Sequence, residues 1–249
     1  MIEAVFISDL HLHPEDRAIQ ERFDRFLEWA RVSVKNVYIL GDFFHAWIGD
    51  DALDNWSKGI ANQLFSLKKQ GINLFYMHGN RDFLVGKKFA RLAGWTFLKE
   101  PTVIELGQDK ILLVHGDRYC TKDLAHQRFR RFTRNRIFSS LFLSLPLKFR
   151  ERIVSQVRYR SQMNQTKSIE EMDVVAEEVL KHMLHHKVVH LIHGHTHKPG
   201  TTFYKNNSQK LARYVLSDWD DKPQALCYDH TKGLYFVHLE FCGEVRYDN

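Results

Sequence analysis

Short apolar runs alternate with longer amphipathic stretches along the first half of the chain. The runs are rich in β-branched and aromatic residues, as buried strands are, whereas the stretches between them repeat their apolar residues with helical spacing. Phe23, Phe26 and Leu27, for example, fall on one helical face. This alternation is typical of βαβ units. The pattern predicts strands at residues 3–8, 37–40 and 72–77, and helices at residues 16–30, 53–69 and 83–92.

The second half of the chain begins with a predicted hairpin, formed by residues 102–106 and 110–114, and then turns helical. Helical spacing continues to Lys187, with a break at Pro146. Strand-like runs return at residues 188–192, 213–216, 224–228 and 234–240, and we expect the last three to be antiparallel. The sequence therefore predicts an α/β protein with a core of residues 1–118 and 186–249 and a helical insertion of residues 119–185.

The composition excludes a disordered or fibrous protein. The 249 residues are 44% hydrophobic and 13% aromatic, which is enough to bury a substantial core. The longest apolar run, residues 137–149, contains Pro146 and Lys148 and is shorter than the roughly 20 apolar residues of a membrane-spanning helix. The chain starts directly on a strand, without the basic segment of an export signal. We therefore expect a cytoplasmic protein.

Positive charge is concentrated in the predicted insertion. The chain as a whole has a formal net charge of +6, but residues 118–167 hold 13 lysines and arginines against two acidic residues. Large apolar side chains are interleaved with these cations, among them Phe132, Phe138 and Leu141. This combination suits an anionic amphiphile or an anionic membrane surface better than it suits a plain solvated face.

Candidate metal ligands follow five of the predicted strands, at the ends where ligand sites form in sheets of this kind. Asp9 and His11 are two residues apart on an extended segment and therefore point to the same side, as do His195 and His197. The oxygen and nitrogen donors are too many for one ordinary site, but they suit two ions bridged by a carboxylate, for which Asp42 is the natural candidate. The predicted ligands are Asp9, His11, Asp42, Asn80, His115, His195 and His197.

These motifs resemble those of the calcineurin-like metallophosphoesterases. Asp-x-His, Gly-Asp, Gly-Asn-Arg-Asp, His-Gly and Gly-His-x-His occur in that order, and the match spans the chain apart from the insertion. The resemblance implies an αββα sandwich with the insertion as a cap, and a binuclear centre that clamps a phosphoryl group and lowers the pKa of a bound water. It assigns Asp9, His11, Asp42 and His197 to one ion, and Asp42, Asn80, His115 and His195 to the other.

A second set of motifs is similar to a narrower family, the UDP-2,3-diacylglucosamine pyrophosphatases of the lipid A pathway. It comprises residues 46–51, 79–87, 120–123 and 172–174. This resemblance implies hydrolysis of the substrate's pyrophosphate bond to UMP and 2,3-diacylglucosamine 1-phosphate, usually with Mn²⁺. It further implies a cap that binds acyl chains and a peripheral position on the cytoplasmic face of the inner membrane of a Gram-negative bacterium. The implied catalytic residues are Asn80, Arg81, His115 and His195, and the implied substrate contacts are Asn80, Arg81, Asp123, Ser161, Asn164, Lys167 and His195.

The basic insertion admits two other interpretations. A nuclease would use the cations for the phosphate backbone and the phenylalanines to stack on bases, whereas a non-catalytic scaffold would need neither. The full ligand set argues against a scaffold, and residues 141–147, Leu-Phe-Leu-Ser-Leu-Pro-Leu, are more apolar than base stacking requires. We therefore expect a lipid substrate, with neither a nucleic acid nor a protein partner.

Arg81 and a cluster of three histidines could each have a structural or a functional role. Arg81 could form an ion pair with Asp82 or Asp123, but its planar guanidinium matches phosphate oxygens, and we expect a phosphate contact. The three histidines, His182, His185 and His186, have a spacing that suggests a metal cluster. These histidines precede a helix end at Lys187, however, and we expect them to form a solvated polar face.

Overall fold

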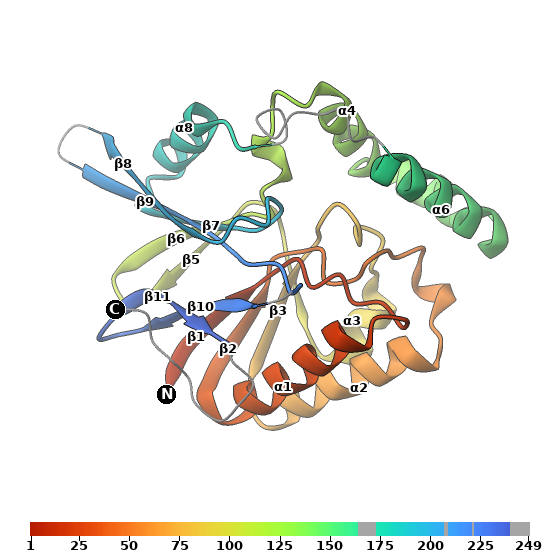
Figure 1. The fold of residues 1–249 in the computed structure, drawn as a ribbon, viewed down its shortest axis with the longest axis horizontal. Coiled ribbons are helices and arrows are strands. Elements are labelled where there is room, and N and C mark those ends of the chain that lie inside the picture. Colours follow the sequence, from red (N-terminus) through yellow and green to blue (C-terminus); the bar gives the residue numbers. More distant parts are fainter. Residues whose placement is uncertain (164–172, 207–208, 221, 240–249) are drawn as a thin grey trace.

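Two β-sheets stack face to face, and helices cover their outer faces (Figure 1). The computed structural model describes residues 1–163, 173–206, 209–220 and 222–239. The first sheet has the order β11-β10-β1-β2-β3-β4 and the second β5-β6-β7-β9-β8. The first consists of β1 (Ile2–Ile7), β2 (Val34–Ile39), β3 (Asn73–Met77), β4 (Thr96–Leu98), β10 (Gln224–Asp229) and β11 (Gly233–His238). The second consists of β5 (Thr102–Leu106), β6 (Asp109–Leu113), β7 (His190–His193), β8 (Gly200–Asn206) and β9 (Gln209–Val215).

Three helices cover the outer face of the first sheet: α1 (Arg17–Ser33), α2 (Asn55–Lys69) and α3 (Lys87–Ala93). The strands β1 to β4 are parallel, as βαβ units require, and β10 joins β1 in antiparallel pairing. Side chains of β1 alternate between the two faces. Val5 and Ile7 pack against the helices, whereas Ala4 and Phe6 belong to the core between the sheets.

The second sheet is covered by α8 (Ala176–His186), whose Val179 and Met183 pack on Leu112 of β6 and Leu191 of β7. This helix completes four layers, helix on sheet on sheet on helix, which confirms the expected αββα sandwich. It falls almost entirely within the range predicted for the insertion, yet it packs on the core. The division of the chain into core and cap stays a prediction.

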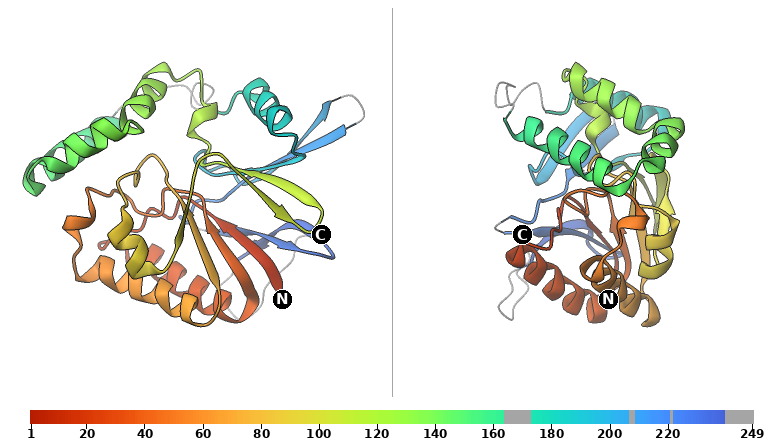
Figure 2. Two further views of the ribbon diagram at one scale, coloured as in Figure 1. Left: turned by 180° about the vertical axis from the view of Figure 1, so that it is seen from behind. Right: turned by 90° about the vertical axis from the view of Figure 1, so that its right-hand side faces the viewer.

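The remaining helices lie over the loop side of the sheets and extend away from them (Figure 2). Arg150 in α6 anchors them, because its buried guanidinium donates to the carbonyl oxygen of Ile48 at 2.6 Å and pairs with Asp51. No helix among the described residues is long and apolar enough to cross a membrane. The elements are a 3-10 turn η2 (Asp117–Tyr119), α4 (Leu124–Thr133), α5 (Arg136–Ser144) and α6 (Leu147–Met163).

One local prediction was wrong, two strands were not predicted, and the expected antiparallel pairing was confirmed in part. The helix expected from residue 83 begins only at Lys87, because the Asp50 carboxylate accepts the backbone N–H groups of Gly86, Lys88 and Phe89 and fixes the helix start there. The strands β4 and β8 were not predicted, since β8 is a polar edge strand without an apolar run. The run that became β9 pairs antiparallel with β8 but parallel with β7.

Candidate metal centre and substrate cleft

The seven predicted ligands lie on loops that follow β1, β2, β3, β6 and β7. The backbone of this region is unusual: five of the seven have φ between 51° and 71°, a left-handed conformation that costs a residue other than glycine about 1 kcal/mol or more. Among the described residues, only one further non-glycine residue, Lys187, has a positive φ. Strain of this kind gathers at functional sites. The five residues are Asp9, His11, Asp42, His195 and His197.

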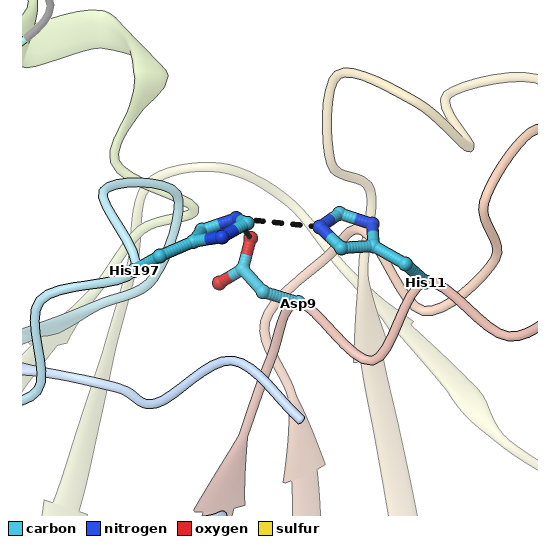
Figure 3. A group of neighbouring side chains, drawn as sticks. All are labelled: Asp9, His11 and His197. Carbon is cyan, nitrogen blue, oxygen red and sulfur yellow. Dashed lines mark hydrogen bonds and ion pairs between the residues drawn. The ribbon is translucent and has the colours of Figure 1, made fainter. Parts of the chain in front are cut away.

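A first group of side chains brings Asp9 and His11 together with His197, from the far end of the chain (Figure 3). The Nε2 atoms of the two histidines are 3.3 Å apart, and His197 Nε2 is 3.5 Å from Oδ1 of Asp9. The other oxygen, Oδ2, accepts the backbone N–H of His195 at 2.8 Å and the hydroxyl of Ser8 at 2.5 Å. Oδ1 is buried without a hydrogen-bond partner and faces the histidines.

A second group unites Asp42, His115 and His195, whose ligand atoms lie within 4.8 Å of one another. Asn80 joins it, because its Oδ1 is 2.9 Å from Nε2 of His115. The Nδ1 of His115 is 2.9 Å from the carbonyl oxygen of Leu40 and donates to it. Both ring nitrogens of His115 thus face oxygen atoms, so Nε2 either carries a proton shared with Asn80 or binds a cation in place of that proton.

The two groups are held next to each other by backbone hydrogen bonds between their loops. His11 N–H donates to the carbonyl oxygen of Asp42 at 3.0 Å, and Asp9 N–H donates to that of Gly41 at 3.1 Å. Gly79 allows the loop after β3 to approach Asp42, because a Cβ atom at this position would collide with the Asp42 carboxylate. Asp42 thus stands beside both groups, where a bridging ligand would have to be.

The electrostatics of the site show a demand for positive charge. Burial alone would lower the pKa of His115, but the carboxylates of Asp42 and Asp117 outweigh it and raise the pKa to about 9. Burial likewise opposes a proton on His197, but the neighbouring carboxylates of Asp218 and Asp9 raise its pKa to about 10. Because both imidazoles would hold a proton at neutral pH, the buried carboxylates attract cations into the space between the ligands.

The residues of both groups fit divalent ions. Imidazole nitrogens with carboxylate and amide oxygens, and no thiolate, are ligands for Mn²⁺, Fe²⁺, Co²⁺ or Zn²⁺. The buried Oδ1 of Asp9 has no hydrogen-bond donor in the protein, and Nε2 of His115 lies close enough to Oδ1 of Asn80 for both atoms to bind one ion. His197 Nδ1 lies 3.4 Å from Oδ2 of Asp218, the carboxylate–histidine arrangement that orients metal-binding imidazoles.

An open cleft of about 510 Å³ adjoins the first group. Its lining includes His11, His197 and Arg81, whose side chain is 32% exposed and whose Nε lies 3.5 Å from Oδ2 of Asp42. Arg81 therefore pairs with neither Asp82 nor Asp123 in the structure, but faces the metal groups and the solvent-filled cleft.

A second guanidinium, which the sequence patterns did not reveal, approaches the cleft from helix α6. Arg158 of α6 donates to the carbonyl oxygen of His45 and contacts its Nδ1 at 3.3 Å, and His45 lines the cleft. Burial and the nearby Arg81 lower the pKa of Arg158 to about 10. Two guanidiniums that repel each other across one cleft favour an anionic ligand. Nothing in the sequence pattern brings residue 158 to residue 81.

Two supporting carboxylates were also missed. Asp82 is fully buried and accepts backbone N–H groups of Phe43 at 2.7 Å and Gly79 at 2.8 Å, as well as those of Asp42 and Phe44 at 3.3 Å. It therefore ties the Asp42 loop to the Asn80 loop. The motif Gly-Asn-Arg-Asp contained this residue, but only the fold shows its partners. Asp218, on the loop after β9, had no motif to mark it.

An ion-pair network connects helix α4 to the second group. Glu100 accepts the backbone N–H of His115 at 3.2 Å and pairs with Arg130 of α4 at 3.0 Å. Arg130 also pairs with the buried Asp117 at 3.0 Å, and Arg134 donates to the carbonyl oxygen of His78 at 3.1 Å. Helix α4 is thereby fixed to the segments that carry His115 and Asn80.

Of the other predicted substrate contacts, Asp123 lies close to the metal groups. Asp123 is the N-cap of α4 and accepts the backbone N–H of His126 at 2.9 Å. The His126 ring in turn lies 5.2 Å from the His195 ring, so this helix start borders the metal groups. Ser161 belongs to α6, but its side chain is outside the described residues, as are Asn164 and Lys167 entirely.

Two clusters of oxygen and nitrogen ligands at the loop ends of an αββα sandwich define a metal-dependent phosphoesterase. A family model of the calcineurin-like phosphoesterases matches residues 3–199, and the chain belongs to that family. The solved structure of GAP50, described as the anchor in the inner membrane complex of Plasmodium, has a TM-score of 0.50 at 11% identity, over 100% of this chain and 88% of that one. This likeness shows the fold alone.

Curated relatives match nearly the whole chain. The UDP-2,3-diacylglucosamine hydrolase of Serratia proteamaculans is 45% identical over 219 residues, which are 88% of this chain and 91% of the relative. The protein of the same name from Pseudomonas putida is 42% identical over 238 residues, 95% of this chain and 99% of the relative. The family resemblance inferred from the motifs is thus confirmed.

Proposed function

We propose that this protein hydrolyses the pyrophosphate bond of UDP-2,3-diacylglucosamine, giving UMP and 2,3-diacylglucosamine 1-phosphate in lipid A biosynthesis. The observation that carries the proposal is the identity of 45% and 42% to hydrolases named for this substrate, along almost their full length. The site supports it chemically. The first group of metal ligands borders a cleft lined by Arg81, and Arg158 contacts His45 in the wall of that cleft, so cations are available for an anionic phosphoanhydride.

Seven residues would hold two divalent ions, for which we propose Mn²⁺ among the metals compatible with these ligands. Asp9, His11, Asp42 and His197 would bind the first, and Asp42, Asn80, His115 and His195 the second. When bound, the pair would polarise phosphoryl oxygens and lower the pKa of a water molecule. The protein's own part is to orient the imidazoles through Leu40 and Asp218, and to bind the phosphates through Arg81.

Arg81 is the side chain that we expect to separate the pyrophosphate from simpler substrates. A charge-assisted hydrogen bond contributes about 1.5–3 kcal/mol, so Arg81→Ala should lower kcat/KM for the nucleotide sugar by about 10- to 100-fold. Hydrolysis of a small aryl phosphodiester should fall much less. Arg152→Ala, on the exposed side of α6, is the matched control and should leave both rates unchanged. Equal losses on the two substrates would make Arg81 structural.

The cap offers a surface for an amphiphilic substrate and for the membrane that contains it. Phe132, Ile137, Leu141 and Phe149 are each 58–69% exposed, although large apolar side chains are usually buried. Exposed cations stand on the same helices, including Arg128, Arg131, Arg136 and Lys148. Apolar side chains with interspersed cations bind anionic membrane surfaces, and we therefore place the protein peripherally on the cytoplasmic face of the inner membrane.

The double variant Ile137→Ser/Leu141→Ser tests this role of the cap. Both side chains are exposed, so the fold should persist, but binding to liposomes that contain anionic lipid should weaken by about tenfold or more, and KM for the diacylated substrate should rise. Val32→Ser, at a 75% exposed residue of α1, is the control and should have no effect. Unchanged liposome binding in the double variant would remove the cap from membrane attachment.

A comparison of three substrates tests the proposed function as a whole. UDP-2,3-diacylglucosamine should be hydrolysed far faster than UDP-glucosamine without acyl chains, because each buried methylene of an acyl chain contributes about 0.8 kcal/mol. Single-stranded RNA or DNA should be the poorest substrate. Faster cleavage of the nucleic acid would replace the lipid assignment by a nuclease and retain only the phosphoesterase centre.

A further inference from the structure

The helix α8 carries a second pair of closely spaced imidazoles, which belong to neither metal group. His182 and His186 are four residues apart on the helix, and their Nε2 atoms are 3.2 Å apart. Sequence analysis expected a solvated polar face. His185 is indeed exposed, but His182 and His186 are only partly exposed and point their ring nitrogens at each other.

This spacing is the one that a shared metal ion requires. Two imidazole nitrogens bound to a tetrahedral Zn²⁺ at about 2.0–2.1 Å lie about 3.3–3.4 Å apart. The predicted ligands His11 and His197 show a similar Nε2 separation, 3.3 Å. Pairs of histidines at positions i and i+4 of one helix are a known arrangement for binding a transition metal, as in the His-Glu-x-x-His motif.

The phenol of Tyr119 orients the inner histidine. Its oxygen lies 2.6 Å from Nδ1 of His182, and Tyr119 itself is only 2% exposed. A metal-binding imidazole commonly donates its other ring N–H to an oxygen in this manner, which fixes the ring and its tautomer. The backbone carbonyl oxygen of Tyr119 also accepts the backbone N–H of Val175 at 3.0 Å, so the same residue holds the start of α8.

The charges around the pair favour neutral, ligating rings. Burial, with help from Arg118, lowers the pKa of His182 to about 4, and the same causes together with His185 lower that of His186. Arg118 also repels a cation. Both histidines, however, lie in the last two turns of α8, where the partial negative charge of a helix C-terminus attracts one.

We propose that His182 and His186 form an accessory site for one divalent transition-metal ion of the imidazole-preferring class, with Zn²⁺ as its probe. Water would complete the coordination. The site is independent of the proposed catalytic function. Because Tyr119 follows His115 by four residues, a bound ion would tie α8 to the segment that leaves β6 for the second metal group.

Zinc stoichiometry tests the proposal. Protein freed of metal with EDTA is dialysed against Zn²⁺, and the zinc bound per chain at saturation is measured by elemental analysis. His186→Gln should bind one ion fewer than the wild type, whereas the neighbouring His185→Gln should bind the same number. Equal zinc content in His186→Gln and the wild type would overturn the proposal, because the 3.2 Å contact would then be a simple N–H···N hydrogen bond.

A second variant examines the orienting phenol. Tyr119→Phe keeps the ring that fills the core but removes the hydroxyl, so the accessory ion should bind about 10- to 100-fold more weakly in zinc titrations followed by calorimetry. The tighter catalytic ions should be unaffected, and Mn²⁺-dependent hydrolysis of a small phosphodiester by His186→Gln should equal that of the wild type. Unchanged affinity in Tyr119→Phe together with normal zinc content in His186→Gln would leave no accessory site.

Discussion

Replacing Asp42 with alanine is expected to remove both metal ions and to abolish turnover. The carboxylate is almost fully buried, accepts the backbone N–H of Arg81 at 2.8 Å and lies 3.7 Å from His115 Nε2. Its loop is also hydrogen-bonded to the loop of Asp9 and His11. Because one side chain stands beside both ligand groups, its loss should weaken both, and kcat on any phosphodiester should fall by about a thousandfold or more.

Elemental analysis and steady-state kinetics on a small aryl phosphodiester measure this effect. Circular dichroism should show an intact fold, since the far strands do not contact Asp42. Asp109→Ala, at the start of β6, is the control for loss of one carboxylate and should retain two ions and full activity. An Asp42→Ala protein that still bound two ions per chain would refute the bridging assignment.

The largest expected loss of stability follows Asp82→Ala. Four backbone N–H groups, from two separate loops, donate to this fully buried carboxylate. Removal of one acceptor leaves several donors unpaired in the interior, and we expect the free energy of unfolding to fall by about 3–5 kcal/mol. Affinity for the second metal ion should fall as well, because Gly79 precedes Asn80.

Urea unfolding of the metal-free protein isolates the stability effect from metal binding. Asp54→Ala serves as the matched comparison. Asp54 is an exposed N-cap residue of α2, and its replacement should lower the free energy of unfolding by only about 0.5–2 kcal/mol. If Asp82→Ala were no less stable than Asp54→Ala, the proposed tie between the two loops would be wrong.

The layered fold could be predicted because its signals are local. The alternation of apolar runs with amphipathic stretches located β1, α1, β2, α2 and β3 to within a few residues. The hairpin β5–β6 and the break at Pro146 were equally visible. The grouping of Asp9, His11 and His197 came from the family resemblance. The structure brings these side chains together although 186 residues separate the two histidines.

The features that were missed depend on contacts between distant segments. The start of α3 is set by Asp50, 36 residues before Gly86, and no pattern within the helix records that contact. The polar edge strand β8 forms only because β9 supplies its hydrogen-bond partners. Arg158 of α6 contacts His45, and Tyr119 contacts His182 of α8. The residues of each pair are far apart in sequence, so both roles appear only once the chain is folded.

Cleavage of the pyrophosphate bond of a diacylated nucleotide sugar is the reaction that we propose for this metal centre. The most direct measurement is incubation of the Mn²⁺-loaded protein with UDP-2,3-diacylglucosamine, followed by chromatography and mass spectrometry of the products. The account predicts UMP and 2,3-diacylglucosamine 1-phosphate in equal amounts, with no product after EDTA treatment or in His197→Ala. Release of UDP with the diacylated sugar, or no turnover by a protein that still hydrolyses simple phosphodiesters, would contradict it.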